Sequence, residues 1–151
     1  MKKIQALQKL QQPSKKLFLL SDIKKLLRIE KDSYAYIFAG RLVQEGVIAR
    51  AYKGVYYLTS NRPVDFELAN FLYRPSCISL LSALHYYGIL IQAPQVIVSV
   101  TPQKTKTIKT LDKEFFYAHL NKKYFSHYQM QNGFLISAPE KALIDTLFLQ
   151  A

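Results

Sequence analysis

The sequence predicts an α+β fold built from two parts, and three observations predict it. Apolar residues recur at helical spacing in the first part of the chain, and after Gly46 they begin to alternate as in strands. Half of the 151 residues are hydrophobic, which is enough to bury a core in each part. Residues 61–63, Asn-Arg-Pro, have the composition of a boundary. We therefore expect one domain at residues 1–60 and another at residues 61–151.

Charge separates the two parts as well. The chain has a net charge of +11 and a pI near 9.7. Residues 1–60 carry 12 Lys and Arg against 4 Asp and Glu, a net charge of +8, whereas residues 61–151 carry 9 against 6, a net charge of +3. An excess of this size favours a polyanionic partner for the first part. A generally basic proteome would explain the excess without such a partner.

The first part begins with alternating helices and short extended runs. Residues 2–11 space their apolar side chains as an amphipathic helix does, and residues 17–20 form an apolar run suited to a short strand. Ser21 is expected to cap a second helix. A third helix is expected from about residue 32 to residue 45, with Gly46 as its C-terminal stop.

A hairpin is expected after the third helix. Residues 47–51 and 55–59 alternate as strands do, and Gly54 in the intervening turn is free to adopt a positive φ. The resulting order is helix, short strand, helix, helix, hairpin. That order is typical of a winged helix-turn-helix, a fold whose second paired helix enters the major groove of double-stranded DNA.

The second part is expected to be a small α+β domain with a mixed or antiparallel sheet and flanking helices. Helical patterns cover residues 64–73, 79–87 and 138–150. Strand patterns cover residues 95–101, 114–120, 124–129 and 133–137. Residues 101–111, rich in Thr and Lys, are expected to form a loop between strands.

Candidate DNA-binding residues follow from a helical wheel of the third helix. One arc is apolar and suits a core, whereas the opposite arc and its flanks carry polar and aromatic side chains: Ser33, Tyr34, Tyr36, Ile37, Arg41 and Gln44. Arg pairs well with guanine and Gln with adenine. The hairpin adds Arg50, Tyr52 and Lys53, which suit phosphate or minor-groove contacts. In the competing interpretation, Tyr34 and Tyr36 pack against the second domain.

The second part shows no pattern typical of catalysis. Its three histidines are scattered, there is no cysteine besides Cys77, and no glycine-rich phosphate loop occurs. We therefore expect no catalytic residues, no metal, no cofactor and no enzyme activity. Lys141 and Asp145 are expected to form an ion pair one helical turn apart. Lys104, Lys106 and Lys109 form either a second nucleic-acid contact or a solvated loop.

Three blocks of the sequence resemble the AbiEi-type antitoxin family. Residues 33–46 (SYAYIFAGRLVQEG), followed by VIAR and KGVY, resemble the N-terminal winged helix of that family. Residues 75–88 (PSCISLLSALHYYG) are similar to its central helix. Residues 137–145 (SAPEKALID) resemble its recurring Pro-Glu-Lys-Ala-Leu-x-Asp segment. Family members often continue beyond this last segment, so the chain is expected to be a short or trimmed member.

This resemblance implies a regulator and antitoxin of a type IV toxin–antitoxin or phage-defence operon. The winged helix would repress its own promoter, at inverted repeats. The C-terminal domain would counter a nucleotidyltransferase-type toxin without a stable complex. The family's DNA contacts fall on the matching positions of this chain: Ser33, Tyr34, Tyr36, Arg41, Gln44, Arg50 and Lys53.

The sequence favours a cytoplasmic location and leaves two rival functions open. A single cysteine, no signal peptide and no membrane span favour the cytoplasm. One rival is a nuclease that a winged helix delivers to nucleic acid, which would require an acidic cluster for a metal ion. The other is a protein-interaction module in which the winged helix binds another protein.

Overall fold

The computed structural model describes residues 3–150 and shows an α+β protein. The chain divides into two compact units, Met1–Pro63 and Val64–Ala151, next to the boundary expected after residue 60. Each unit has its own sheet and its own buried cluster of apolar side chains. Lys2, expected at the start of the first helix, lies outside the described residues.

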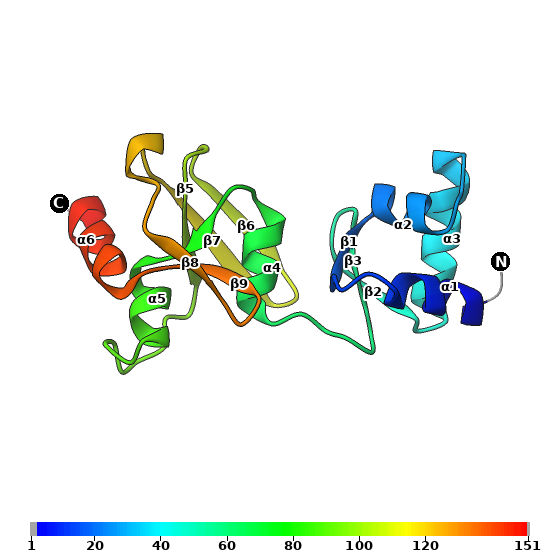
Figure 1. Cartoon of the computed structure of the whole chain (residues 1–151), viewed down its shortest axis with the longest axis horizontal. Coiled ribbons are helices and arrows are strands. Elements are labelled where there is room, and N and C mark those ends of the chain that lie inside the picture. The colour runs from blue at the N-terminus through cyan, green and yellow to red at the C-terminus, as the bar shows by residue number, and fades with distance from the viewer. Residues whose placement is uncertain (1–2, 151) are drawn as a thin grey trace. The chain divides into compact units, whose positions relative to one another are not determined.

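Unit 1 follows the expected order of helix, short strand, helix, helix and hairpin (Figure 1). Its elements are α1 (Lys3–Gln11), β1 (Leu17–Leu19), α2 (Leu20–Leu26), α3 (Asp32–Gln44), β2 (Ile48–Tyr52) and β3 (Val55–Leu58). The strands form an antiparallel sheet in the order β1-β3-β2. Side chains from α1, α2, α3 and one face of this sheet form the core, among them Leu10, Phe18, Ile23, Phe38 and Ile48.

The start of α2 differs from the expectation for Ser21. Because β1 runs directly into α2, the N-cap position falls on Leu19, and Ser21 lies within the first turn. Asp22 takes over the capping role: its carboxylate accepts a hydrogen bond from the Leu19 backbone N–H at 2.8 Å. A carboxylate in the first turn also interacts favourably with the positive end of the helix dipole.

Unit 2 contains a six-stranded mixed sheet in the order β6-β7-β5-β4-β9-β8. The pairs β5–β7 and β4–β9 are parallel and the other neighbours are antiparallel. The elements are α4 (Asp65–Leu72), β4 (Cys77–Ile78), α5 (Leu80–Tyr86), β5 (Ile97–Thr101), β6 (Lys106–Thr110), β7 (Lys113–His119), the 3₁₀ helix η1 (Lys122–Tyr124), β8 (Tyr128–Gln131), β9 (Phe134–Ser137) and α6 (Pro139–Gln150).

Helices cover both faces of this sheet (Figure 1). On one face, the Tyr117 hydroxyl of β7 donates to the Ala69 carbonyl of α4 at 2.5 Å. On the other face, Cys77 and Val100 of the sheet cluster with Leu80 of α5 and Leu149 of α6. The sheet therefore lies between α4 on one side and α5 with α6 on the other.

The expectation of a loop at residues 101–111 is wrong for its second half. Residues 106–110 form the edge strand β6, paired antiparallel with β7. Only Ile108 of this strand is buried, so the segment lacks the apolar alternation that marks a half-buried strand. Lysine on an edge strand discourages pairing with other chains, which accounts for its polar composition.

Candidate nucleic-acid interface

Helix α3 has a buried arc and an exposed arc. Ala35, Phe38, Ala39 and Leu42 are buried in unit 1. On the opposite arc, Tyr36 and Ile37 are 63% and 62% exposed, and the remaining members, Ser33, Gly40 and Gln44, are also exposed. The two arcs have the composition and accessibility of a helix that packs on a core by one side and meets a partner by the other.

Gly40 gives the exposed arc a flat centre. A Cβ atom at this position would meet nothing within 4 Å, so the fold does not need the glycine for lack of space. Glycine in a helix interior costs about 0.5–1 kcal/mol relative to alanine. Its presence on an outward face therefore suits a close approach by another surface.

Tyr34 and Arg41 flank the exposed arc and rest on Phe38. The Tyr34 and Phe38 ring centroids are 6.1 Å apart, and the Arg41 guanidinium carbon lies 5.6 Å from the Phe38 centroid. Both flanking side chains remain exposed, Tyr34 by 48%. Packing against Phe38 limits their motion while leaving the guanidinium and the phenol accessible.

The end of α3 is tied directly to the hairpin. Gly46 has a φ of +76°, which ends the helix, and the Val47 N–H donates to the Leu42 carbonyl at 3.0 Å. The Thr59 hydroxyl, just after β3, donates to the Gly46 carbonyl at 2.6 Å. These bonds fix the direction of the hairpin relative to the helix.

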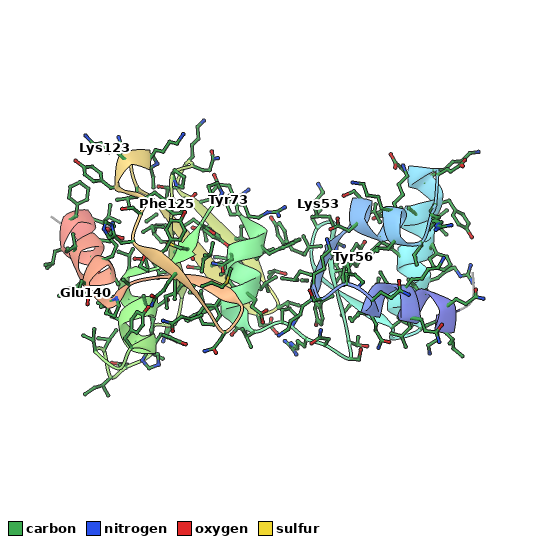
Figure 2. All side chains as sticks on the ribbon, viewed as in Figure 1. Lys53, Tyr56, Tyr73, Lys123, Phe125 and Glu140 are labelled. Atoms are coloured by element: carbon green, nitrogen blue, oxygen red, sulfur yellow. The ribbon has the colours of Figure 1, made fainter. Side chains whose placement is uncertain are left out.

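The hairpin carries Arg50, Tyr52 and Lys53 near its turn. Arg50 lies opposite Tyr56, a core residue, so it projects from the sheet face against which α3 packs. The register shifts between Arg50 and Tyr52, a β-bulge, and the Arg50 Nε–H donates to the Tyr52 carbonyl at 3.4 Å. Lys53 is exposed at the tip (Figure 2), and Tyr52 is partly buried. Of the three, Arg50 and Lys53 are therefore the accessible cations.

Ion pairs neutralise two of the acidic side chains in unit 1. Asp22 lies 3.4 Å from Lys15, and Asp32 lies 2.6 Å from Lys24.

The turn between α2 and α3 carries Arg28 and Lys31, which are exposed next to the N-terminus of α3. Arg28 and Lys31 were not among the DNA-binding residues predicted from the sequence. Their position between the two paired helices is the sequence feature that could have indicated them. Exposed cations therefore occur both in the turn before α3 and in the hairpin after it.

The three lysines expected as a second basic contact do not form one group. The Tyr73 hydroxyl donates to the Lys104 carbonyl at 3.0 Å, and Lys106 Nζ lies 5.1 Å from the Tyr73 ring centroid. Lys109 lies on the opposite face of β6 from Lys106 and pairs with Glu114 at 3.6 Å. The structure therefore joins Lys104 and Lys106 around Tyr73 and separates Lys109 from them.

The acidic residues of unit 2 include a buried pair. Lys141 donates to Asp145 one turn along α6, as the sequence predicts, and Asp145 is 2% exposed.

Within residues 3–150, no group of three or more His, Cys, Asp or Glu side chains could hold a metal ion. No described helix has the length and apolar character needed to cross a lipid bilayer.

No model of a known protein family matches the chain, and no curated protein matches it.

Proposed function

We propose that unit 1 is a winged helix-turn-helix that binds double-stranded DNA and that the protein is a transcriptional regulator. One observation carries this proposal: α3 buries one arc in the core and exposes the opposite arc, and its C-terminal end is hydrogen-bonded to the hairpin that carries exposed Lys53. A major groove about 12 Å wide admits a helix presented in this way.

Each exposed residue has a role in this proposal. Arg41 and Gln44 read base edges, because their side chains match guanine and adenine. Tyr36 and Ile37 contact thymine methyl groups or sugars, and Gly40 allows the helix to approach the groove closely. Ser33 and Tyr34, at the start of α3, lie where recognition helices contact bases. Lys53 and Arg50 contact phosphates or the minor groove, and Tyr52 supports the turn.

We further propose that the protein is an AbiEi-like antitoxin of a type IV toxin–antitoxin system. It would act in the cytoplasm, repress its own operon at inverted repeats and counter a nucleotidyltransferase-type toxin without forming a stable complex. The support is the resemblance of three sequence blocks, together with the α+β fold of unit 2. Residues 137–145, the third block, hold the buried pair Lys141–Asp145, so this block stabilises unit 2.

A binding titration tests the DNA-binding role. The full chain is titrated against the duplex upstream of its own gene at two salt concentrations, with a scrambled duplex as control. We expect tighter binding to the upstream duplex, and affinity that falls steeply with salt because bound phosphates release counterions. Arg41→Ala should weaken binding to the upstream duplex, whereas Lys122→Ala, an exposed cation of unit 2, should not. Equal affinity of wild type and Arg41→Ala would count heavily against the assigned face.

Coexpression tests the antitoxin role separately. The wild-type chain should restore growth of cells that express the toxin from the neighbouring gene. Arg41→Ala should lose repression of the operon promoter but keep this rescue, because unit 2 is unchanged. Failure of the wild-type chain to rescue growth would remove the antitoxin proposal and leave the DNA-binding proposal in place.

The exposed aromatic and aliphatic side chains favour a protein-interaction module as a second candidate. Tyr34, Tyr36 and Ile37 are 48%, 63% and 62% exposed, and such side chains are common in protein–protein interfaces. Lack of duplex binding even at low salt would favour this candidate over DNA binding.

A further inference from the structure

Helix α6 has an apolar stripe that unit 2 leaves uncovered. Leu143, Ile144, Leu147 and Phe148 are 46%, 59%, 64% and 58% exposed. The opposite arc is buried: Ala142 is fully covered, and Asp145 and Thr146 are 2% and 7% exposed. Contiguous exposed apolar side chains of this kind mark interaction sites.

The stripe continues onto the neighbouring segment through an aromatic contact. The Phe148 and Tyr124 ring centroids are 5.7 Å apart, and Lys123 Nζ lies 5.0 Å from the Tyr124 centroid. A hollow of about 360 Å³ adjoins the stripe, and its lining includes Lys123, Tyr124, Glu140 and Ile144. The surface therefore offers both a ridge of apolar side chains and a recess.

Charges of opposite sign stand at the two ends of this stripe. Glu140 is exposed in the first turn of α6, and Lys123 lies beside the ring that Phe148 contacts near the other end of the helix (Figure 2). Within the described part of the chain, Glu140 makes no salt bridge. Phe148 lies eight positions after Glu140, which corresponds to about 12 Å along the helix axis.

We propose that the α6 stripe is the contact surface between two copies of this chain, with their α6 helices antiparallel. A two-fold axis near Ile144 would place each Leu143 and Leu147 against those of the second copy. It would also place Glu140 of one copy opposite Phe148 and Lys123 of the other, so opposite charges meet twice. Such a surface is self-complementary, as a two-fold contact between identical chains requires.

Two copies joined in this way would carry two α3 helices. A pseudo-palindromic site is read by a two-fold symmetric protein, so the dimer would match an inverted repeat. The contact itself is argued from the surface of unit 2, and only its use on DNA rests on the proposed function.

Sedimentation velocity of the full chain over a range of micromolar concentrations tests the contact. We expect a concentration-dependent dimer whose dissociation constant rises by about tenfold or more in Leu147→Lys, because a charge replaces an apolar side chain at the contact. Ile91→Lys, at a loop position that is 95% exposed, is the matched control and should leave the dimer unchanged. Circular dichroism and thermal unfolding confirm that each variant is folded.

A charge exchange tests the antiparallel arrangement. Glu140→Lys and Lys123→Glu should each weaken the dimer by about threefold, and the double exchange should restore it. A wild-type chain that is monomeric at all concentrations, or a dimer that Leu147→Lys does not affect, overturns the proposal. A monomer that still binds its upstream duplex would assign the stripe to a different partner protein and leave the proposed function intact.

Discussion

Ser79 and Asp145 meet in the interior of unit 2 although 66 positions separate them in the sequence. The Ser79 hydroxyl donates to Oδ2 of Asp145 at 3.3 Å, and Lys141 donates to Oδ1 of the same carboxylate. Ser79 is fully covered and Asp145 is 2% exposed. These bonds attach α6 to the junction of β4 and α5, so the carboxylate supports the fold of unit 2.

Asp145→Ala is therefore expected to destabilise the protein strongly. It leaves the Lys141 ammonium, whose side chain is 12% exposed, without its partner. Breaking a buried ion pair in this way costs about 3–5 kcal/mol, measured as the free energy of unfolding in urea. Asp65→Ala is the control, because its ion pair with Lys113 lies at the surface: the Asp65 and Lys113 side chains are 44% and 37% exposed. This substitution should lower the free energy of unfolding by about 1 kcal/mol or less. Equal losses in the two variants would contradict a buried role for Asp145.

Substitutions at Gly40 should separate stability from recognition. Gly40→Ala is expected to raise the free energy of unfolding by about 0.5–1 kcal/mol, because the helix interior favours alanine and the position is open. Gly40→Leu should keep the fold, because the added side chain also enters solvent, but should weaken binding to the upstream duplex. Denaturant unfolding and duplex titration measure the two effects. Unaltered duplex affinity in Gly40→Leu would argue against close approach of the groove to this arc.

Lys53→Ala and Gln44→Ala should affect DNA binding in different ways. Removing one phosphate contact at Lys53 should lower affinity for all duplexes and reduce the slope of log K against log salt by about 1. Removing a base contact at Gln44 should reduce the preference for the upstream duplex by about 1–3 kcal/mol and leave the salt slope unchanged. Titrations on specific and scrambled duplexes at several salt concentrations distinguish these patterns. Identical effects of the two variants would refute the division of roles.

The thiol of Cys77 is expected to be unreactive in the folded protein. Burial raises its pKa from 9.0 to about 11, so almost no thiolate is present at pH 8. The pKa of Cys77 is higher in the folded protein than in the unfolded chain. The contribution of the protonated thiol to the free energy of unfolding is therefore fully present below pH 9 and is lost as the pH rises toward 11. Thiol-reagent labelling at pH 8 should be slow until denaturant is added.

Replacing Cys77 provides the control for the pH effect. Cys77→Ala lacks the titrating group, so its stability should fall less than that of the wild type between pH 9 and 11. Parallel pH dependence in the two proteins would show that another group dominates this window.

Much of unit 1 could be predicted because its signals are local. The helical spacing of Phe38 and Leu42, the stop at Gly46 and the turn at Gly54 each act within a few residues. Gly46 and Gly54 adopt φ values of +76° and +73°, as the predicted helix stop and hairpin turn require. The exposed arc of α3 followed from the same periodicity, because the residues outside the buried arc are those that face solvent.

The elements missed by sequence analysis depend on contacts distant in the sequence. The two-residue strand β4 is defined by its pairing with β5 and β9, and Cys77–Ile78 is too short to show a strand pattern in the sequence. Strand β6 has a single buried residue, Ile108, and exists because β7 pairs with it. Ser21 was assigned a cap by residue type alone, whereas the direct join of β1 to α2 gave that role to Asp22.

The division of α3 into a buried arc and an exposed arc allows the exposed residues to change without loss of the fold. Ala35, Phe38, Ala39 and Leu42 carry the helix's share of the core, and the outward positions carry none of it. Mutations at Ser33, Tyr36, Ile37 and Gln44 can therefore accumulate with little loss of folded protein. A library that varies these four positions and excludes proline, which would break the helix, would retain many foldable members, and new partner preferences could be selected from it without compensating changes elsewhere in the chain.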